Sequence, residues 1–358
     1  MKLLLTLDFM PESGGIQRYL SDIVTHTFSA EDMVVTLLPG NCHPDDTHYP
    51  CRIVRLTFFG TSRVNKKLFL PVMAAFLIRE ILRHGPRLTV VAGNIYPALI
   101  AGAVSFAFSL KYRVYTYGTE LCALKEPNSL RARMWRMALS RAQTVYYLSN
   151  ATLNLLRECG SELPLQQWLP RIDLPAGPVP VKASDGDTVR LLCIGRLVRH
   201  KGHALLLESL KNPPSGLPWH LTVAGGGVQY GHLVSMVHKY ALDSSVTIAG
   251  EVSQQTLEKL YEAADIFIFP SIDTTSAFEG FGIVLLEAMA YEAAIIATRS
   301  DAVSEVFNNC EGCADLVPAG DTQSLRNAIF ALVADRERRG HMSRSALSFL
   351  KERYVWRR

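Results

Sequence analysis

The sequence predicts an α/β protein with two doubly wound parallel sheets, and three observations lead to this prediction. Short apolar, β-rich runs alternate with helical patterns along the chain. The alternation is interrupted once, over residues 170–188, by an aperiodic segment rich in proline and glycine. The chain has 358 residues, 48% of them hydrophobic, and is long enough for two domains with separate cores.

The predicted strands define the two domains. In the first half they lie at residues 3–8, 34–39, 88–93, 113–118 and 144–149. In the second half they lie at residues 189–195, 220–226, 245–250, 266–271, 293–299 and 314–320. We therefore expect a first domain over residues 1–172, a linker over 173–187 and a second domain over 188–358.

Two apolar segments resemble targeting or membrane signals. The run at the amino terminus is short and ends at Asp8, so we expect a buried strand, no export and a cytoplasmic protein. Residues 88–110 carry no charge, as a membrane span would, but Gly93, Asn94 and Pro97 interrupt them. We expect a buried strand over 88–92, a turn, and a helix over about 97–109.

Cysteines and acidic pairs do not indicate a metal site. The seven cysteines are an odd number scattered through a large chain, which favours free thiols in a reducing compartment. Cys310 and Cys313 form a lone CxxC without a nearby histidine, and we interpret it as packing or chance. Asp185 and Asp187 resemble a DxD metal motif, but they lie in the predicted linker. We expect no bound metal.

Positive charge is concentrated in the first half. Residues 1–170 hold 18 Lys and Arg against 12 Asp and Glu, whereas the remainder holds 19 against 21. The excess gathers in residues 61–87 and 129–142, where Arg or Lys alternates with large apolar residues. Such stretches suit an anionic membrane or an anionic acceptor, and solvated helices packed on a sheet are an equal alternative. Nucleic acid is not expected, because no recognition motif accompanies the charge.

Glycines and basic residues follow the first strand of each predicted sheet, where open α/β sheets bind ligands. Residues 14–20, GGIQRYL, open a helix with two glycines, and such a turn admits a phosphate to the helix N-terminus. Residues 195–202, GRLVRHKG, place Arg196 and Lys201 in one loop. These two cations suit a diphosphate, Arg through paired hydrogen bonds and Lys as a point charge.

Together these motifs resemble the retaining family-4 glycosyltransferases of GT-B fold, in particular the phosphatidylinositol mannosyltransferase-like members. GRLVRHKG is similar to their GRLxxxKG, AGGG (224–227) to the turn after the next strand, and LYEAADIFIFPS (260–271) to their YxxADxxxxPS. EGFGIVLLEAMA (279–290) is similar to their E-x₇-E motif. The resemblance covers nearly the whole chain and implies two Rossmann-like domains that face a central cleft.

The resemblance also implies the roles of site residues. Arg196 and Lys201 neutralise the leaving diphosphate, Glu279 faces hydroxyls of the donor sugar, and these three form the catalytic set. The donor-binding set contains Glu287, which accepts hydrogen bonds from the ribose, and the following residues: Gly15, Tyr117, Gly225, Val252, Gly280, Phe281, Gly282 and Ile283. Gln17 and Arg18 are the candidate acceptor contacts. The implied reaction needs no metal or other cofactor and proceeds by front-side attack with retention.

Tyr117 departs from the family, which commonly has His in this HGxE turn. We expect its hydroxyl to donate to the sixth oxygen of the donor sugar, with packing as an equal alternative. The family's GxP after the E-x₇-E helix reads Glu292-Ala293-Ala294 here, and the next loop has Asp301-Ala302 in place of Gly-Gly. Relatives also continue past the position of Arg358 into a helix that returns to the first domain. From these departures we expect weaker donor binding and looser domain closure.

The favoured function is transfer of a hexose, with GDP-mannose as the favoured donor, to a lipid-linked or cell-envelope glycan acceptor. A UDP-linked glucose, galactose or N-acetylglucosamine donor is the main alternative. A sugar-nucleotide epimerase of similar fold would give no reason for the basic first domain. A non-catalytic sugar-nucleotide-binding subunit would retain Glu287 and lose Arg196 or Lys201, and both are present.

Overall fold

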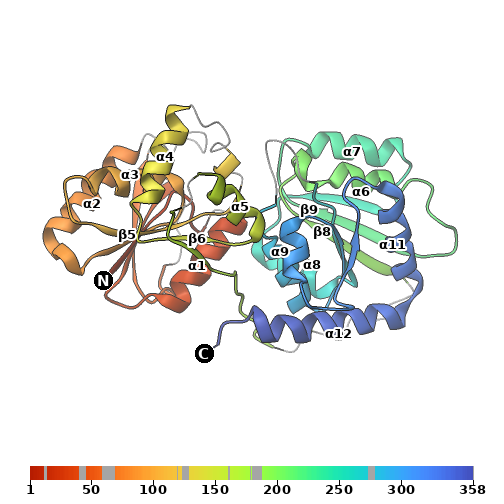
Figure 1. Ribbon diagram of the computed structural model, residues 1–358. Coiled ribbons are helices and arrows are strands. Elements are labelled where there is room, and N and C mark those ends of the chain that lie inside the picture. The colour runs from red at the N-terminus through yellow and green to blue at the C-terminus, as the bar shows by residue number, and fades with distance from the viewer. Residues whose placement is uncertain are drawn as a thin grey trace. The chain divides into compact units, whose positions relative to one another are not determined.

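Two parallel sheets organise the chain in the computed structural model (Figure 1). The chain divides into two units, Met1–Pro170 and Arg171–Arg358. The structure describes residues 1–11, 14–39, 46–58, 69–118, 120–122, 129–159, 162–177, 179, 188–272 and 279–357. Most of the segment predicted as a linker, including Asp185 and Asp187, lies outside this part of the chain.

The first unit contains a seven-stranded sheet with the order β3-β2-β1-β4-β5-β6-β7, and all its ladders are parallel. Its strands are β1 (Lys2–Leu5), β2 (Met33–Pro39), β3 (Arg52–Phe58), β4 (Thr89–Ala92), β5 (Lys111–Tyr115), β6 (Thr144–Tyr147) and β7 (Leu165–Gln167). Its helices are α1 (Gly15–Thr27), α2 (Leu70–His84), η2 (Gly85–Arg87), α3 (Ile95–Val104), α4 (Leu130–Ser140) and α5 (Asn150–Cys159).

The second unit contains a six-stranded sheet with the order β10-β9-β8-β11-β12-β13, again parallel throughout. Its strands are β8 (Val189–Ile194), β9 (Trp219–Ala224), β10 (Val246–Gly250), β11 (Ile266–Phe269), β12 (Ala294–Thr298) and β13 (Asp315–Val317). Its helices are η4 (Arg199–Lys201), α6 (His203–Ser209), α7 (Tyr230–Lys239), α8 (Gln254–Ala263), α9 (Ile283–Ala290), α10 (Asp301–Val306), α11 (Thr322–Ala334) and α12 (Arg336–Arg353).

Both sheets reverse their strand order at one place, and this confirms the predicted doubly wound class. In the first unit the order reverses between β1 and β4, and in the second between β8 and β11. Crossover helices on either side of such a point leave on opposite faces of the sheet and open a crevice at the carboxyl ends of the strands. The loops after β1 and β4, and after β8 and β11, are therefore the places where each unit can bind a ligand.

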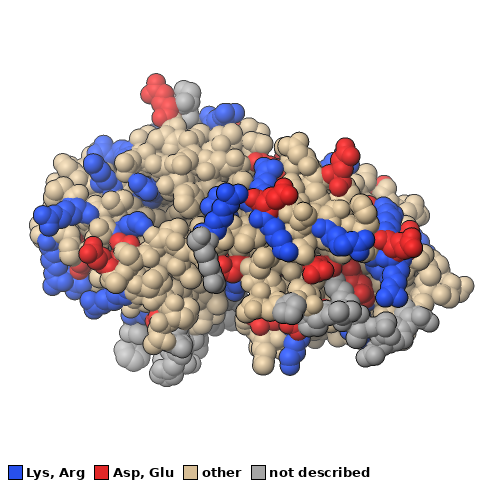
Figure 2. All heavy atoms as spheres, turned by 90° about the horizontal axis from the view of Figure 1, so that it is seen from below, with Lys and Arg blue, Asp and Glu red and all other residues tan. Residues whose placement is uncertain are grey.

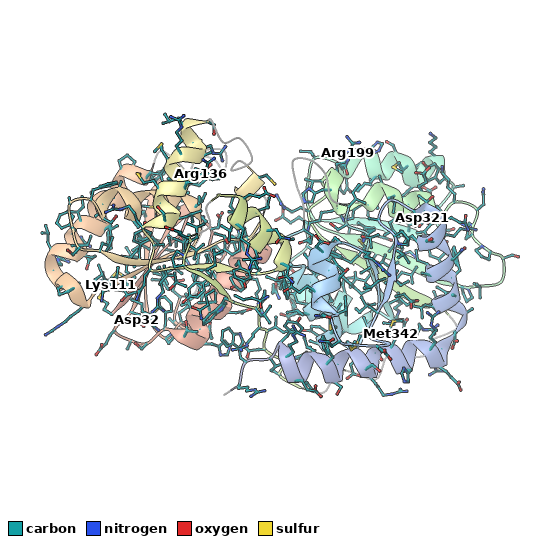
Figure 3. All side chains as sticks on the ribbon, in the orientation of Figure 1. Asp32, Lys111, Arg136, Arg199, Asp321 and Met342 are labelled. Atoms are coloured by element: carbon teal, nitrogen blue, oxygen red, sulfur yellow. A yellow bond between two sulfur atoms is a disulfide. The ribbon has the colours of Figure 1, made fainter. Side chains whose placement is uncertain are left out.

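Buried apolar strands explain why each sheet forms. Strand β11 in the middle of the second sheet is wholly apolar, and its residues Ile266, Phe267 and Ile268 are fully buried. Removing one such side chain from water contributes about 1.5 to 3 kcal/mol. Helices α6, α7 and α11 pack together on one face of this sheet, and α9 and α12 on the other (Figure 1). On α12 the sulfur of Met342, labelled in Figure 3, accepts a hydrogen bond from the backbone of Ile295 at 3.2 Å.

In the first unit, the two faces of the sheet are covered by different helices. Tyr112 on β5 donates its hydroxyl to Ala138 of α4 at 2.5 Å. Tyr115, three residues later, points to the opposite face and meets Tyr19 of α1 edge-on at 5.9 Å. Helices α2, α3 and α4 pack against one another on the first of these faces. The whole unit is thus a sheet between two helical layers.

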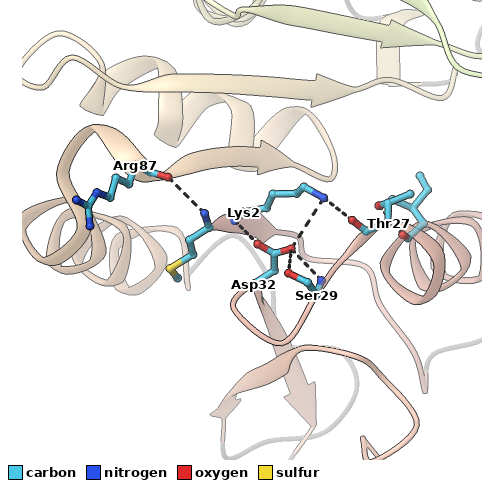
Figure 4. A network of polar contacts seen from close by, with 7 residues as sticks. Lys2, Thr27, Ser29, Asp32 and Arg87 are labelled. Carbon is cyan, nitrogen blue, oxygen red and sulfur yellow. Dashed lines mark hydrogen bonds and ion pairs between the residues drawn. The ribbon is translucent and has the colours of Figure 1, made fainter.

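A polar network closes the amino edge of the first sheet, opposite to the ligand-binding edge (Figure 4). The carboxylate of Asp32 accepts hydrogen bonds from the backbone of Lys2 and of Ser29, and the Lys2 ammonium reaches the carbonyl of Thr27. Burial acts to raise the pKa of Asp32, but the backbone hydrogen bonds from Lys2 and Ser29 outweigh it and lower that pKa. These hydrogen bonds therefore stabilise the fold by joining the start of β1 to the turn between α1 and β2.

The chain enters the second unit beside its C-terminal end. Ile172 forms a parallel bridge with Val355, and its N–H donates to the carbonyl of Tyr354 at 2.9 Å. Tyr354 is fully buried, and its hydroxyl donates to Val306 at 3.0 Å. Residues 171 and 172, which we placed in the first domain, therefore group with the second unit.

The structure also departs from the sequence predictions in three details. Strands β3 and β7 were not predicted, and the helix expected over about 97–109 begins at Ile95 and ends at Val104. A separate finding concerns membrane spans: no helix in the described residues has both the length and the apolar character that a span requires. The third departure is a cysteine pair. Cys310 and Cys313 form a disulfide, which corrects the prediction of free thiols for this pair. Gly312, with φ +74°, turns the backbone between them.

Candidate active site

The loop after β8, which carries Arg196, is fastened to the loop after β9. The N–H of Leu197 donates to the carbonyl of Gly226 at 2.8 Å. A Cβ at Gly225 would lie 2.0 Å from the carbonyl oxygen of Gly195, and φ at Gly225 is +145°. Only glycine fits there, so this predicted donor residue serves the close approach of the two loops.

The other end of the same loop, which carries Lys201, is fastened to the end of β11. The carbonyl of His200 accepts hydrogen bonds from the N–H of Ile272 at 2.7 Å and from the hydroxyl of Ser271 at 3.0 Å. A Cβ at Gly202 would lie 1.8 Å from the carbonyl oxygen of Pro270. The backbone that carries Lys201 is therefore fixed at the point where the sheet reverses its order.

Lys201 and Glu279 form an ion pair, so the structure brings together two of the three predicted catalytic residues. Their side chains are 18% and 11% exposed, and the Lys201 ammonium also lies 5.5 Å from the centre of the Phe269 ring. Arg196, the third predicted catalytic residue, is exposed on the same loop as Lys201. Arg196 and the Lys201–Glu279 pair therefore lie at the carboxyl edge of the second sheet.

The helices that begin at this edge lack side-chain caps at their N-termini. Helices α6, α7 and α9 follow the loops after β8, β9 and β11, and none of them has a side-chain cap or an acidic residue in its first turn. The other helices of the second unit, α8, α10, α11 and α12, are capped by Ser253, Ser300, Asp321 and Asp335. Uncapped N-termini favour an anion, through free N–H groups and the helix dipole. The edge can therefore hold a diphosphate.

Helix α9 begins at the predicted donor loop, residues 280–283. Gly282 has φ +87° in the left-handed region, and Ile283 is the first helical residue. The side chain of Phe281 is buried and meets the ring of Tyr354 edge-on at 5.9 Å. Phe281 can therefore reach a ligand only through its backbone, whereas Gly280 and Ile283 are partly exposed. Val252 lies partly exposed in the loop after β10.

Glu287 lies one turn into α9 and is held by a residue to which the sequence assigned no role. The hydroxyl of Tyr261, on α8, donates to Glu287 Oε2 at 2.7 Å. Tyr261 is 2% exposed, whereas Glu287 is partly exposed. In the sequence, only the position of Tyr261 in the LYEAADIFIFPS motif could have indicated this contact, because Tyr261 and Glu287 are 26 positions apart.

His203 is a buried group beside Lys201. Burial, with the nearby charges of Lys201 and His200, lowers the pKa of His203 from 6.5 to about 4. Its Nδ1 atom is buried and has no hydrogen-bond partner. The imidazole is therefore neutral at physiological pH and adds no charge to the diphosphate region.

The first unit places its predicted residues at the start of α1, at the carboxyl edge of its own sheet. Gly15 is the first residue of α1, and the side chain of Gln17 folds back against Gly14. Arg18 pairs with Asp22 on the same helix at 3.3 Å, and its side chain is 39% exposed. The structure therefore brings Gly15, Gln17 and Arg18 together in one turn.

A polar contact crosses the place where the first sheet reverses its order. Asn94, which caps α3, donates to Asp8 Oδ2 at 2.9 Å and so joins the loops after β1 and β4. In the next loop, Glu120 accepts hydrogen bonds from the N–H groups of Tyr117 and Gly118 at 2.5 and 3.2 Å. Burial raises the pKa of Glu120, although these hydrogen bonds act to lower it.

The structure does not support the role predicted for Tyr117. Its hydroxyl donates to the carbonyl of Gly93 at 2.6 Å, and the side chain is 7% exposed. The ring also meets Tyr19 edge-on at 5.8 Å. Because a phenol has one proton to donate, Tyr117 cannot donate to a sugar in this conformation. The alternative of packing is the one that the structure favours.

Within the described ranges, no group of three or more His, Cys, Asp and Glu side chains is placed to hold a metal ion.

Comparisons with known proteins agree with this architecture. Residues 180–349 match the family model of glycosyl transferases group 1. A GDP-mannose-dependent monoacylated alpha-(1-6)-phosphatidylinositol monomannoside mannosyltransferase from Corynebacterium glutamicum is 27% identical, over 99% of this chain and 94% of its own. A GDP-mannose-dependent alpha-(1-6)-phosphatidylinositol monomannoside mannosyltransferase from Mycobacterium tuberculosis is 25% identical over the same shares.

Solved structures share the fold of both units. Sucrose-phosphate synthase from Thermosynechococcus elongatus has a TM-score of 0.80 at 18% identity, over 99% of this chain and 95% of that one. Anabaena HepE, solved with UDP and glucose, has a TM-score of 0.76 at 17% identity, over 99% of this chain and 96% of that one. The protein is thus a glycosyltransferase of GT-B fold. Its second unit carries the glycosyl transferases group 1 domain.

Proposed function

We propose that this protein transfers a hexose, with mannose favoured, from a nucleotide diphosphate sugar to a lipid-linked or cell-envelope glycan acceptor. Two relatives that cover 99% of the chain are named as GDP-mannose-dependent mannosyltransferases of phosphatidylinositol monomannosides. Their identities of 27% and 25% support this donor and this kind of acceptor. A UDP-sugar donor is the alternative that the test must separate.

The observation that carries the proposal is the Lys201–Glu279 ion pair beside the uncapped start of α9. The diphosphate of the donor would bind Arg196, Lys201 and the free N–H groups, and Glu279 would turn from Lys201 to the sugar hydroxyls. As the bond between the anomeric carbon and the diphosphate oxygen breaks, these groups stabilise the negative charge that develops.

The reaction retains configuration and needs no metal. The acceptor oxygen bonds to the anomeric carbon on the face that the diphosphate leaves, and the acceptor proton passes to the leaving phosphate. No protein base is required for this step. Arg196 and Lys201 supply the positive charge that a metal ion supplies in other phosphate sites.

Thermal unfolding with nucleoside diphosphates tests the donor. A ligand at 100 times its dissociation constant stabilises the folded state by about 2.7 kcal/mol. We expect GDP to raise the melting temperature more than UDP, with or without EDTA, and transfer from GDP-mannose to yield an α-linked product. Stabilisation by UDP alone would reassign the donor, loss of activity in EDTA would exclude the metal-independent mechanism, and an epimerised free donor would favour the epimerase.

A lipid-linked acceptor agrees with one exposed surface of the first unit. We define the α4 face as Leu130, Arg131, Arg133, Met134 and Met137, with Arg141 and Phe106 at its end. Leu130 and Phe106 are 73% and 62% exposed, and residues 129–142 contain no acidic residue. Arg136, labelled on α4 in Figure 3, adds a further cation to this helix.

The charge of the first unit suits an anionic membrane. On the face of the first unit that Figure 2 shows from below, Lys and Arg gather with few Asp and Glu beside them, whereas the two signs mix over the second unit. Helix α4 lies at the top of Figure 1, so this basic face is distinct from the α4 face. Exposed apolar side chains between arginines bind the boundary of an anionic leaflet. The proposal therefore places the protein in the cytoplasm, peripheral on an anionic membrane surface. Residues 61–68 of the first predicted basic stretch lie outside the described residues.

Vesicle sedimentation tests this surface. Each arginine near an anionic leaflet contributes about 1 kcal/mol, so Arg131→Glu with Arg133→Glu should lower vesicle binding at least thirtyfold at low salt. The matched control is Arg344→Glu with Lys351→Glu, two exposed cations of α12. Equal binding to neutral and anionic vesicles, or equal losses in the two double variants, would favour the interpretation of ordinary solvated helices.

A further inference from the structure

Glu287 is held from one side by the hydroxyl of Tyr261. The hydroxyl lies 2.7 Å from Glu287 Oε2, a short distance that is typical of a hydrogen bond to a carboxylate. The Tyr261 residue is buried in the core and is 2% exposed. Glu287, in contrast, is partly exposed at the carboxyl edge of the sheet. The hydrogen bond therefore joins a buried donor to an acceptor that solvent and ligands can reach.

The position of this hydroxyl is itself fixed by two aromatic contacts. The ring of Tyr261 stacks on Tyr291, with 5.5 Å between centroids and 8° between planes. It also stacks on Phe267 of β11 at 6.0 Å and 29°. Tyr291 follows α9 directly and Phe267 is fully buried in the sheet, so both contacts belong to the framework that carries the site. A tyrosine has two side-chain torsions, and these contacts restrict both.

We propose that Tyr261 is a positioning residue that orients the Glu287 carboxylate toward a vicinal diol, the two hydroxyls of a nucleoside diphosphate ribose. This proposal rests on the proposed function and on the ribose contact that the family resemblance implies for Glu287. A carboxylate has about four lone-pair positions, and Tyr261 occupies one of them. The rotation of the carboxylate is then fixed before the ligand arrives, so the diol binds at a smaller entropic cost.

A merely structural role predicts a different result. If Tyr261 only fills space between Phe267 and Tyr291, removing its hydroxyl lowers stability and leaves ligand preference unchanged. If it orients Glu287, removing the hydroxyl weakens binding only of ligands that have the ribose diol. Comparing ribonucleotides with their dideoxy analogues separates these possibilities.

The experiment is titration calorimetry of the full chain with GDP, UDP and their 2′,3′-dideoxy analogues. In Tyr261→Phe we expect a loss of about tenfold in affinity for the ribonucleotide that binds, which corresponds to 1.4 kcal/mol. We expect less than a twofold change for the dideoxy analogue. In a Glu287→Gln background, Tyr261→Phe should cause much less further loss.

Tyr112→Phe is the matched control, because it also removes a buried tyrosine hydroxyl hydrogen bond but lies in the first unit, where Tyr112 donates to Ala138 of α4. It should preserve the ribose preference. Tyr291→Leu, which retains the Tyr261 hydroxyl and removes a stacking partner, should give an intermediate loss, so the proposal remains testable if Tyr261→Phe folds poorly.

Three outcomes would overturn the reasoning at different levels. A parent protein that binds neither GDP nor UDP contradicts the proposed function. A parent that binds ribose and dideoxyribose forms equally contradicts the assignment of the ribose to Glu287. Clear ribose preference that is unchanged in Tyr261→Phe contradicts the positioning role alone.

Discussion

Replacing Glu292 by glycine should stabilise the protein. Glu292 follows α9 and has φ +57°, in the left-handed region that glycine adopts readily and that costs other residues about 1 to 2 kcal/mol. Glycine at this position costs about 0.4 to 1 kcal/mol through the greater freedom of the unfolded chain. The backbone hydrogen bond from Glu292 to Met289, 3.1 Å long, remains in the variant. The difference predicts a gain of about 0.5 to 1 kcal/mol for Glu292→Gly.

Urea unfolding of the parent and the variant measures this gain, with a rise in melting temperature of about 1 to 4 °C as a second readout. Ala241→Gly is a parallel case, because Ala241 is exposed and has φ +53°, and it should gain a similar amount. Lys259→Gly, at an exposed position inside α8, should instead lose about 0.5 to 1 kcal/mol. Loss of stability in both Glu292→Gly and Ala241→Gly would refute the backbone argument.

Four further changes have defined outcomes. His203 binds a proton in the unfolded chain but not in the folded chain between pH 6.5 and about 4, so stability should fall as pH is lowered. Urea unfolding should show a loss of about 2 kcal/mol from pH 7 to 5 that is absent in His203→Asn. Arg326→Ala removes hydrogen bonds to carbonyls at the end of α6 and should cost about 2 to 4 kcal/mol in the same assay, whereas an unchanged midpoint would contradict it. Tyr117→Phe should lower stability by about 1 to 3 kcal/mol and leave kcat/KM for the donor unchanged; a selective loss of kcat/KM would restore the sugar contact. Glu279→Gln should lower turnover and strengthen binding of free nucleoside diphosphate, because the Lys201 ammonium no longer has a carboxylate partner; weaker binding in calorimetry would contradict this.

The fold could be predicted because its central strands are buried on both faces. Such strands appear as continuous apolar runs, and every strand predicted in this way is present in the structure. Strand β3 was missed because its sequence, RIVRLTF, alternates Arg with apolar residues at the edge of the sheet. Strand β7 was missed because it has three residues, two of them glutamine. Edge position and shortness remove the signal on which the prediction depends.

The candidate site could be predicted only as far as individual loops. The loops after β8 and β11 were recognisable from their motifs, but the pairing of Lys201 with Glu279 joins residues 78 positions apart. The same is true of Tyr117, whose partner Gly93 lies on a neighbouring strand end. Local sequence shows which side chains reach the edge of a sheet. The order of the strands decides which of these side chains meet.

The contact between Phe281 and Tyr354 connects the donor loop to the segment where the chain enters the second unit. Phe281 meets the ring of Tyr354, and the backbone carbonyl of Tyr354 holds the N–H of Ile172, where the chain enters the second unit. One residue, Tyr354, therefore joins the Gly-Phe-Gly loop to the entry segment, through one side-chain contact and one backbone hydrogen bond.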